Sequence, residues 1–472
     1  AAEVAKEKNT LESINDVSCL YDRYFASIRQ DLDDLETPAL LKAAGIVAFF
    51  RVLDRTNEEL MNAIEETFGI APDTLWEAII RLHELEICDL YEDEAARVSD
   101  QVLATYLFYL AFFKAPVLDF GKLLSAFFPK HRGRLVDAIN PVLSAFDSAV
   151  VMDAMRPHVE RFWEQLELER DRENLFQLVE VFWFLKQTDT LVFARDHIAV
   201  LPIAQVDLAS LDFYAKPASP SHSVLNILSS FQFVDDNSFR IAFNLICDYF
   251  EKCPDQLPKF LHLLLETFCF HHISWMHAYS VQKAVIDLLW ERARQGEDWF
   301  FTKTFLAIAE KYLHTRFHIS ESKGNHAITM IDFQLASSQP LAALRKTIWD
   351  GLFKLHNDVR YEGDAIKMLK HYSAPNMNIS VKEIVAQDAV EVIAFIDQAM
   401  SPLNFQHVLM AQAYLDKLEH FEVPFEPSLR EKFENETYRL HKLLASDLSE
   451  MMGDGLSYDA YVQLKKQRIV PL

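Results

Sequence analysis

Histidine and cysteine are two of the residue types that bind metal ions in proteins. Two groups of these residues lie close together in the sequence: His271, His272 and His277 near Cys269, and His314 with His318. On a helix, the spacing of the second pair would place two imidazoles on one face, as a zinc site requires. No HExxH arrangement is present, and chance pairs are common among 17 histidines. We therefore expect these side chains at helix ends and on polar faces, and we predict no metal site.

The cysteines do not form a disulfide framework. Their number is odd, no two of them form a CxxC pair, and they are Cys19, Cys88, Cys247, Cys253 and Cys269. This usage is typical of reduced thiols in a cytosolic protein. The sequence also lacks a long uncharged apolar run and begins without the apolar core of a signal peptide. We expect a cytoplasmic protein that makes no contact with membranes.

Nucleotide and nucleophile motifs are missing. A P-loop needs two glycines five positions apart, followed by Lys and Ser or Thr, so that backbone amides can surround the phosphates. No two of the ten glycines have this spacing, and no GxSxG sequence is present. We predict that the chain is not an enzyme and binds no cofactor of its own. A cryptic enzymatic site, assembled from distant residues between helices, stays open as an alternative.

The charge balance disfavours nucleic acid as a partner. The chain carries 46 basic and 70 acidic residues, a net charge of −24, whereas a phosphate-binding protein normally presents a basic face. Two basic segments remain, and both have a simpler interpretation as a solvated turn and a helix end. They are Lys130, Arg132 and Arg134 in one loop, and Lys465, Lys466 and Arg468 near the C-terminus.

The elements that would position these side chains begin with a winged helix. Apolar spacing predicts helices over residues 39–53, 58–68 and 73–85, with Asn57 and Asp73 as N-caps and Gly69 as a stop. Leu75, Trp76, Ile79, Ile80 and Leu82 would form the apolar face of the third helix. Two short extended segments, 87–91 and 96–99, then flank an acidic turn. This order outlines a winged helix within residues 39–115, after a helical connector over residues 1–38.

In a DNA-binding winged helix, the third helix enters the major groove. Here it carries Asp73, Glu77 and Glu84 against a single basic residue, Arg81. These charges would repel phosphates, so we interpret the winged helix as a structural spacer. A nucleic-acid-binding regulator is the alternative, and salt-sensitive binding to duplex DNA would favour it.

Residues 116–472 predict an uninterrupted helical array. Apolar residues recur at helical spacing through segments such as 305–313, 344–355, 390–400 and 406–418, with a candidate break at 215–223. No repeat of fixed period is visible, so we expect a degenerate α-solenoid, with an irregular helical bundle as the alternative. The predicted fold class is all-α: a small helical segment and a winged helix, followed by a long solenoid-like array.

Residues 40–113 carry a family resemblance. The stretches LLKAAGIVAFFRVLDRTNEELMNAI and LWEAIIRLHELEICDLYEDEAARVSDQVLATYLFY resemble the region that follows the ATPase core in bacterial STAND-type (NACHT/AAA-like) signalling ATPases. In that family, a P-loop module precedes a small helical part, a winged helix and a helical-repeat sensor. The resemblance implies that this chain is the C-terminal part of such a protein, with ATP and magnesium bound by a module N-terminal to Ala1.

The resemblance also marks one position near the winged helix. Related receptors have a Met-His-Asp motif there, whose His senses the nucleotide, and Val98, Ser99 and Asp100 occupy the comparable place. Asp100 matches, but Ser99 stands where the motif has its His, so the nucleotide-sensing side chain of the motif is missing at this position. The local interpretation is that Ser99 or Asp100 caps the next helix.

The same resemblance implies a protein ligand, such as a phage protein recognised in antiviral defence, and self-association through the ATPase module. Large aromatic side chains of the array could anchor this ligand. They are Trp163, Trp183, Phe231, Trp275 and Trp299. We expect most of this set in the core, because a 12% aromatic content must largely be buried.

Overall fold

The computed structural model describes residues 38–205, 224–295, 299–323, 327–373 and 381–439. Three predicted features lie outside these ranges. They are residues 1–37 of the connector predicted over 1–38, the break at 215–223 and the basic residues near position 466. The described chain is predominantly helical, which confirms the predicted all-α class. Its only sheets in the described ranges are small and antiparallel. It forms two compact units, which divide between Phe193 and Ala194. The boundary between residues 115 and 116 stays a prediction.

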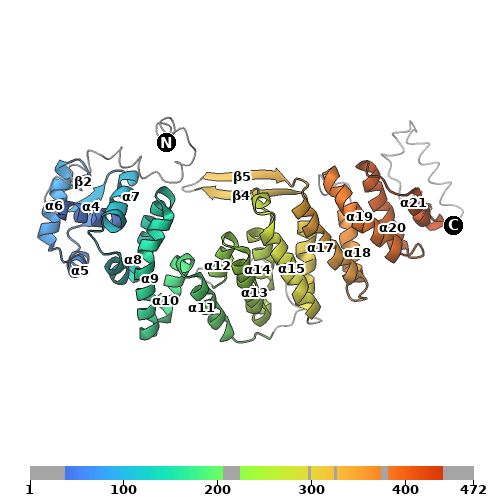
Figure 1. The fold of residues 1–472 in the computed structure, drawn as a ribbon, viewed down its shortest axis with the longest axis horizontal. Coiled ribbons are helices and arrows are strands. Elements are labelled where there is room, and N and C mark those ends of the chain that lie inside the picture. Colours follow the sequence, from blue (N-terminus) through green and yellow to red (C-terminus); the bar gives the residue numbers. More distant parts are fainter. Residues whose placement is uncertain (1–37, 206–223, 296–298, 324–326, 374–380, 440–472) are drawn as a thin grey trace, which may run out of the picture. The chain divides into compact units, whose positions relative to one another are not determined.

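The first unit begins with a winged helix (Figure 1). Its elements are α4 (Ala39–Phe50), β1 (Leu53–Asp54), α5 (Glu58–Phe68), α6 (Pro72–Glu84), β2 (Cys88–Tyr91) and β3 (Ala95–Val98). The strands are antiparallel in the order β1-β3-β2, and Asp89 pairs with Arg97 across the wing. The predicted succession of helices and extended segments is therefore present.

Local signals in the sequence set most of these helix ends. The Asn57 side chain accepts a hydrogen bond from the Leu60 amide, and Gly69 ends α5 with a positive φ of 68°. Two expectations for α6 were wrong. Asp73 is not its N-cap, because Pro72 starts the helix one residue earlier, after Ala71. Ile80 does not belong to the apolar face, because 41% of its surface is exposed.

Helices continue to the end of the first unit, and the last of them crosses its boundary. They are α7 (Gln101–Tyr109), the π-helix η2 (Leu110–Lys114), α8 (Phe120–Ala145), α9 (Ser148–Glu169), α10 (Arg172–Phe182), the 3₁₀ turn η3 (Trp183–Leu185) and α11 (Gln187–Ala199). Phe49, Phe108, Phe112 and Phe127 are buried where α4, α7, η2 and α8 meet. This aromatic core joins the winged helix to the helices that follow it.

The second unit is a run of helices that pack on near neighbours. They are α12 (Val224–Ser229), α13 (Asp236–Lys252), α14 (Leu257–His262), α15 (Ser280–Gln295), α16 (Trp299–Tyr312), α17 (Gln339–His356), α18 (Glu362–Ser373), α19 (Lys382–Ala399), α20 (Phe405–His420) and α21 (Pro427–Phe433), with the short turns η5 (Ser230–Phe233), η6 (Pro254–Gln256), η7 (Leu263–Thr267) and η8 (Ser274–His277). Helix α15 packs on α13, α16 and α17, and α20 packs on α18, α19 and α21. Among the described residues, the strongest packing is between helices that are near neighbours in the sequence, as in a helical array.

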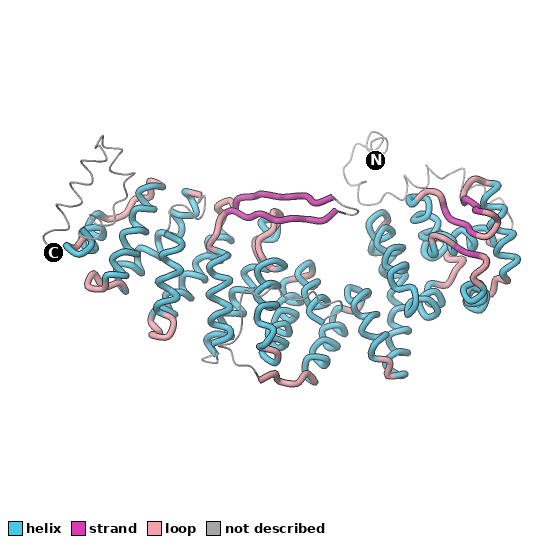
Figure 2. The backbone as a smooth tube through the Cα atoms, turned by 180° about the vertical axis from the view of Figure 1, so that it is seen from behind, coloured by secondary structure: helices cyan, strands magenta, loops and turns pink. Residues whose placement is uncertain are grey.

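A β-hairpin interrupts these helices, whereas the sequence predicted no strands in this part of the chain. Strands β4 (Arg316–Lys323) and β5 (Ala327–Gln334) pair antiparallel, and Figure 2 draws them in magenta. Phe317 faces Phe333 and Ile319 faces Ile331, because apolar residues alternate here with period two. His318 lies on β4, where its ring is 3.3 Å from the Asp332 carboxylate. The helical spacing considered for His314 and His318 is therefore not realised.

None of the helices in the described ranges is both long enough and apolar enough to cross a membrane.

Candidate functional site

The predicted nucleotide-sensing pair lies where β3 meets α7. Asp100 is the N-cap of α7, and its carboxylate accepts hydrogen bonds from the amides of Val102 and Leu103 at 2.6 and 2.9 Å. Ser99 lines a cavity of about 300 Å³ together with Arg51 and Arg97. The local interpretation of Asp100 as a cap is therefore confirmed, and a nucleotide-sensing role stays a prediction.

The basic residues at 130–134 do not form a free positive loop. They lie inside α8, at a kink where His131 leaves helical geometry. Lys130 is 2.7 Å from Glu59, and Arg132 is 2.7 Å from Glu180, while Arg134 is exposed. The nearby acids already compensate two of these cations, which weakens the segment as a site for an anionic partner.

The aromatic candidates separate into buried and exposed side chains. Trp163 and Phe231 are buried, and the Trp163 ring nitrogen donates to Glu167 at 2.9 Å. Trp183 and Trp299 are half-buried. Trp275 differs from all of these, because 65% of its surface is exposed.

The turn that carries Trp275 has a strained backbone. Ala278 and Tyr279 follow η8 with positive φ angles of 49° and 58°, a conformation that side chains with a Cβ rarely adopt. Tyr279 is buried and its amide donates to the Ser274 carbonyl at 3.1 Å. The adjacent Met276 is 63% exposed. The fold therefore holds two large apolar side chains in solvent on an anchored turn.

A buried charged network ties together the helices at the other end of the second unit. Arg345 of α17 donates to both carboxylate oxygens of Asp388 of α19, with its Nη2 2.6 Å from Oδ2. The Tyr372 hydroxyl of α18 donates to the same carboxylate at 2.5 Å. Lys417 of α20 donates to the Tyr372 carbonyl at 2.5 Å, and its ammonium lies 3.6 Å from the centre of the Tyr372 ring. All four side chains are buried, so this network fixes α17–α20 relative to one another.

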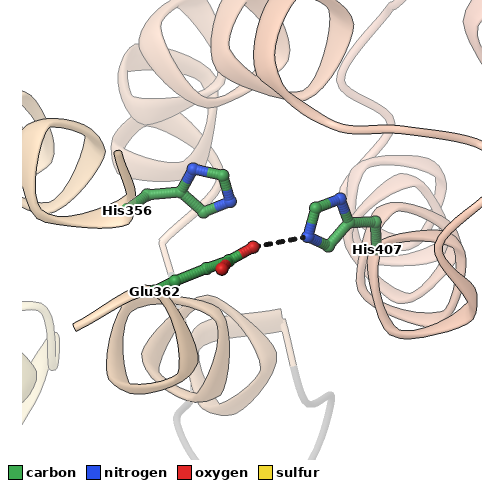
Figure 3. A group of neighbouring side chains, drawn as sticks. All are labelled: His356, Glu362 and His407. Atoms are coloured by element: carbon green, nitrogen blue, oxygen red, sulfur yellow. Dashed lines mark ion pairs between the residues drawn. The ribbon is translucent and has the colours of Figure 1, made fainter. Parts of the chain in front are cut away.

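At one end of these four helices, two histidines and a glutamate converge. His356 ends α17, Glu362 begins α18 and His407 lies in the first turn of α20. Nε2 of His407 is 3.6 Å from Oε1 of Glu362. Figure 3 shows a ring nitrogen of His356 turned toward the same carboxylate. One nitrogen or oxygen of each residue lies within 4.8 Å of the others, and both histidines are buried.

Sequence reasoning missed this cluster. Its members lie on three helices and share no motif, so only the packing of α17, α18 and α20 brings them together. The histidines near Cys269, which the sequence did single out, are not joined by a reactive thiol. Burial raises the pKa of Cys269 to about 11, which keeps its thiol protonated at neutral pH.

Comparisons with models of protein families, with curated proteins and with solved structures found no match for this chain.

Proposed function

We propose that this chain is a protein-binding module that engages its partner through the turn of Trp275 and Met276. The observation that carries this proposal is the exposure of both side chains on a strained, anchored turn. Large aromatic side chains dominate the binding energy of many interfaces. A rigid turn also reduces the entropy that is lost when they are buried by a partner. Because Trp275 and Met276 are apolar, the partner that fits them is a protein with an apolar pocket.

The family resemblance supports a more specific proposal. A winged helix followed by a helical array is the order found in the sensor part of STAND-type ATPases, and the winged helix and the array lie in that order here. In this proposal the array recognises a foreign protein, such as a phage protein. The nucleotide-binding and self-associating module then precedes Ala1 in the native polypeptide. The intact mass of the endogenous protein tests this, and a native start at Ala1 would contradict it.

Binding to individually purified phage proteins, measured by biolayer interferometry, tests the surface. For a phage protein that binds, Trp275→Ala is expected to weaken binding about thirtyfold or more, because such anchors contribute about 2 kcal/mol or more. The control is Leu168→Ala, which removes an exposed apolar side chain of α9 in the first unit. Equal loss in both variants, or none in Trp275→Ala, would contradict the assignment of this turn.

A nucleic-acid-binding regulator is the weaker alternative, because the exposed side of α6 is acidic. Arg81 lies 2.5 Å from Glu84 within that helix, and Arg55 lies 3.2 Å from Asp73. Glu77 is exposed between them. Arg55 and Arg81 are thus paired with carboxylates. A DNA phosphate would have to displace these carboxylates before it could bind either arginine.

A further inference from the structure

His356 is a buried side chain without a hydrogen-bond partner. Its exposed fraction is 8%, and neither Nδ1 nor Nε2 forms a hydrogen bond. The ring packs edge-on against Phe395, with centroids 4.9 Å apart. Buried polar groups in proteins are nearly always satisfied, so an imidazole with both nitrogens unpaired in the core has a nitrogen available to coordinate a ligand.

The surroundings of this imidazole indicate which ligand it would take. His407 and Glu362 add one imidazole and one carboxylate, and the three candidate ligand atoms lie within 4.8 Å of one another. The neighbouring charged network does not enter the cluster, because Arg345 and Asp388 bond to each other. Two imidazoles and one carboxylate are a ligand set for divalent transition metals, and for zinc in particular.

We propose that His356, Glu362 and His407 bind a divalent transition metal ion, with Zn²⁺ as the preferred ion. The Glu362 side chain is 40% exposed, whereas that of His407 is 8% exposed, so the ion enters beside the carboxylate. A fourth coordination position is left for water on that side. The ion joins the turn between α17 and α18 to the start of α20.

Coordination requires two local adjustments. Zinc bonds of about 2.0–2.2 Å bring tetrahedral ligand atoms to roughly 3.3 Å from one another, so the three ligand atoms, which now lie within 4.8 Å of one another, must move closer together. Nδ1 of His407 accepts a hydrogen bond from the Ser401 amide at 3.1 Å. Binding through Nε2 places the ring proton on Nδ1, which breaks this contact. One backbone hydrogen bond is thus exchanged for metal–ligand bonds.

Isothermal titration calorimetry with ZnCl₂ tests the site on the full chain, produced without a histidine tag and stripped with chelator. We expect one ion per chain, with a dissociation constant in the low micromolar range or below. Glu362→Gln keeps the shape of the side chain and is expected to weaken binding at least tenfold. His371→Ala is the matched control, because His371 forms a separate His–Glu pair with Glu310 at 3.0 Å and its loss should change nothing.

Co²⁺ titration supplies a second readout that does not depend on stability. Visible d–d bands should develop in the wild-type chain and be lost in His407→Gln, with circular dichroism showing that the variant stays folded. No binding to the wild-type chain would overturn the proposal. Equal binding by wild type and Glu362→Gln would place the ion elsewhere and would overturn it as well.

Discussion

Lys417 shows how burial changes the chemistry of one residue. It lies on α20 and is buried. This burial lowers the pKa of Lys417 to about 7, although the negative charge of Asp388 acts in the opposite direction. In the unfolded chain its pKa is the ordinary value of about 10.4. Between these two values the unfolded chain holds more protons, so the free energy of unfolding rises with pH across this range.

Replacement of Lys417 by Met should remove this dependence. Below pH 7, the Met variant has no buried charge at this position, so its free energy of unfolding should exceed that of wild type. This difference should shrink as pH rises from 7 to 9. The change is expected to be of the order of a few kcal/mol, because one pKa unit corresponds to 1.36 kcal/mol. Urea denaturation of both proteins at several pH values measures it. Parallel stability curves would show that Lys417 keeps an ordinary pKa.

Asp388 compensates Arg345, and its removal should be costly. In Asp388→Asn the guanidinium stays charged and buried without its carboxylate partner, so we expect a loss of about 3–5 kcal/mol in the free energy of unfolding. Glu391→Gln provides the control, since it removes an exposed ion pair with Lys346 between the same two helices. That change should cost at most about 1 kcal/mol. Similar losses in the two variants would contradict the assigned importance of burial.

At the scale of elements, helix contacts decide which glycines can be replaced. A Cβ at Gly351 of α17 would lie 2.6 Å from Cζ of Phe305 in α16, and this ring is buried against Trp290. We expect Gly351→Ala to destabilise the second unit by about 1–3 kcal/mol, as overpacking does. Thermal denaturation followed by circular dichroism measures the effect.

Gly363 of α18 is the matched control for this overpacking. A Cβ there meets no atom within 4 Å, so Gly363→Ala should be neutral or slightly stabilising, since alanine favours the helix. A decrease in the melting temperature of Gly363→Ala would show that contact with Phe305 is not the deciding factor. An unchanged melting temperature in Gly351→Ala would show the same.

The sequence predicted helices and their ends best where short-range signals act alone. Asn57, Gly69 and Asp100 were assigned correctly because a cap depends on a few neighbouring residues. The hairpin was missed because a helical expectation was extended over residues that alternate with period two. The His356 cluster was beyond reach, because its ligands come together only through the packing of three helices.

At the scale of the whole molecule, charge opposes binding to nucleic acid. The net charge is −24, and the exposed side of α6 adds unfavourable local charge. We expect no change in the fluorescence anisotropy of a labelled DNA duplex at about 50 mM salt, where non-specific binders associate readily. A triple variant with D73K, E77K and E84K is a gain-of-charge control. Salt-sensitive binding by the wild-type chain would instead favour the regulator alternative.

The charged network of Arg345, Asp388, Tyr372 and Lys417 has a consequence for how this array can vary in length. In a solenoid whose repeats contact only their neighbours, an extra helical pair can be inserted with little harm. Here one carboxylate is shared by side chains from α17 and α18 and lies on α19. A pair of helices inserted between α18 and α19 would move Arg345 away from Asp388 and leave both charges buried without a partner. We therefore expect an inserted or deleted helical pair to be more damaging within α17–α20 than elsewhere in the array.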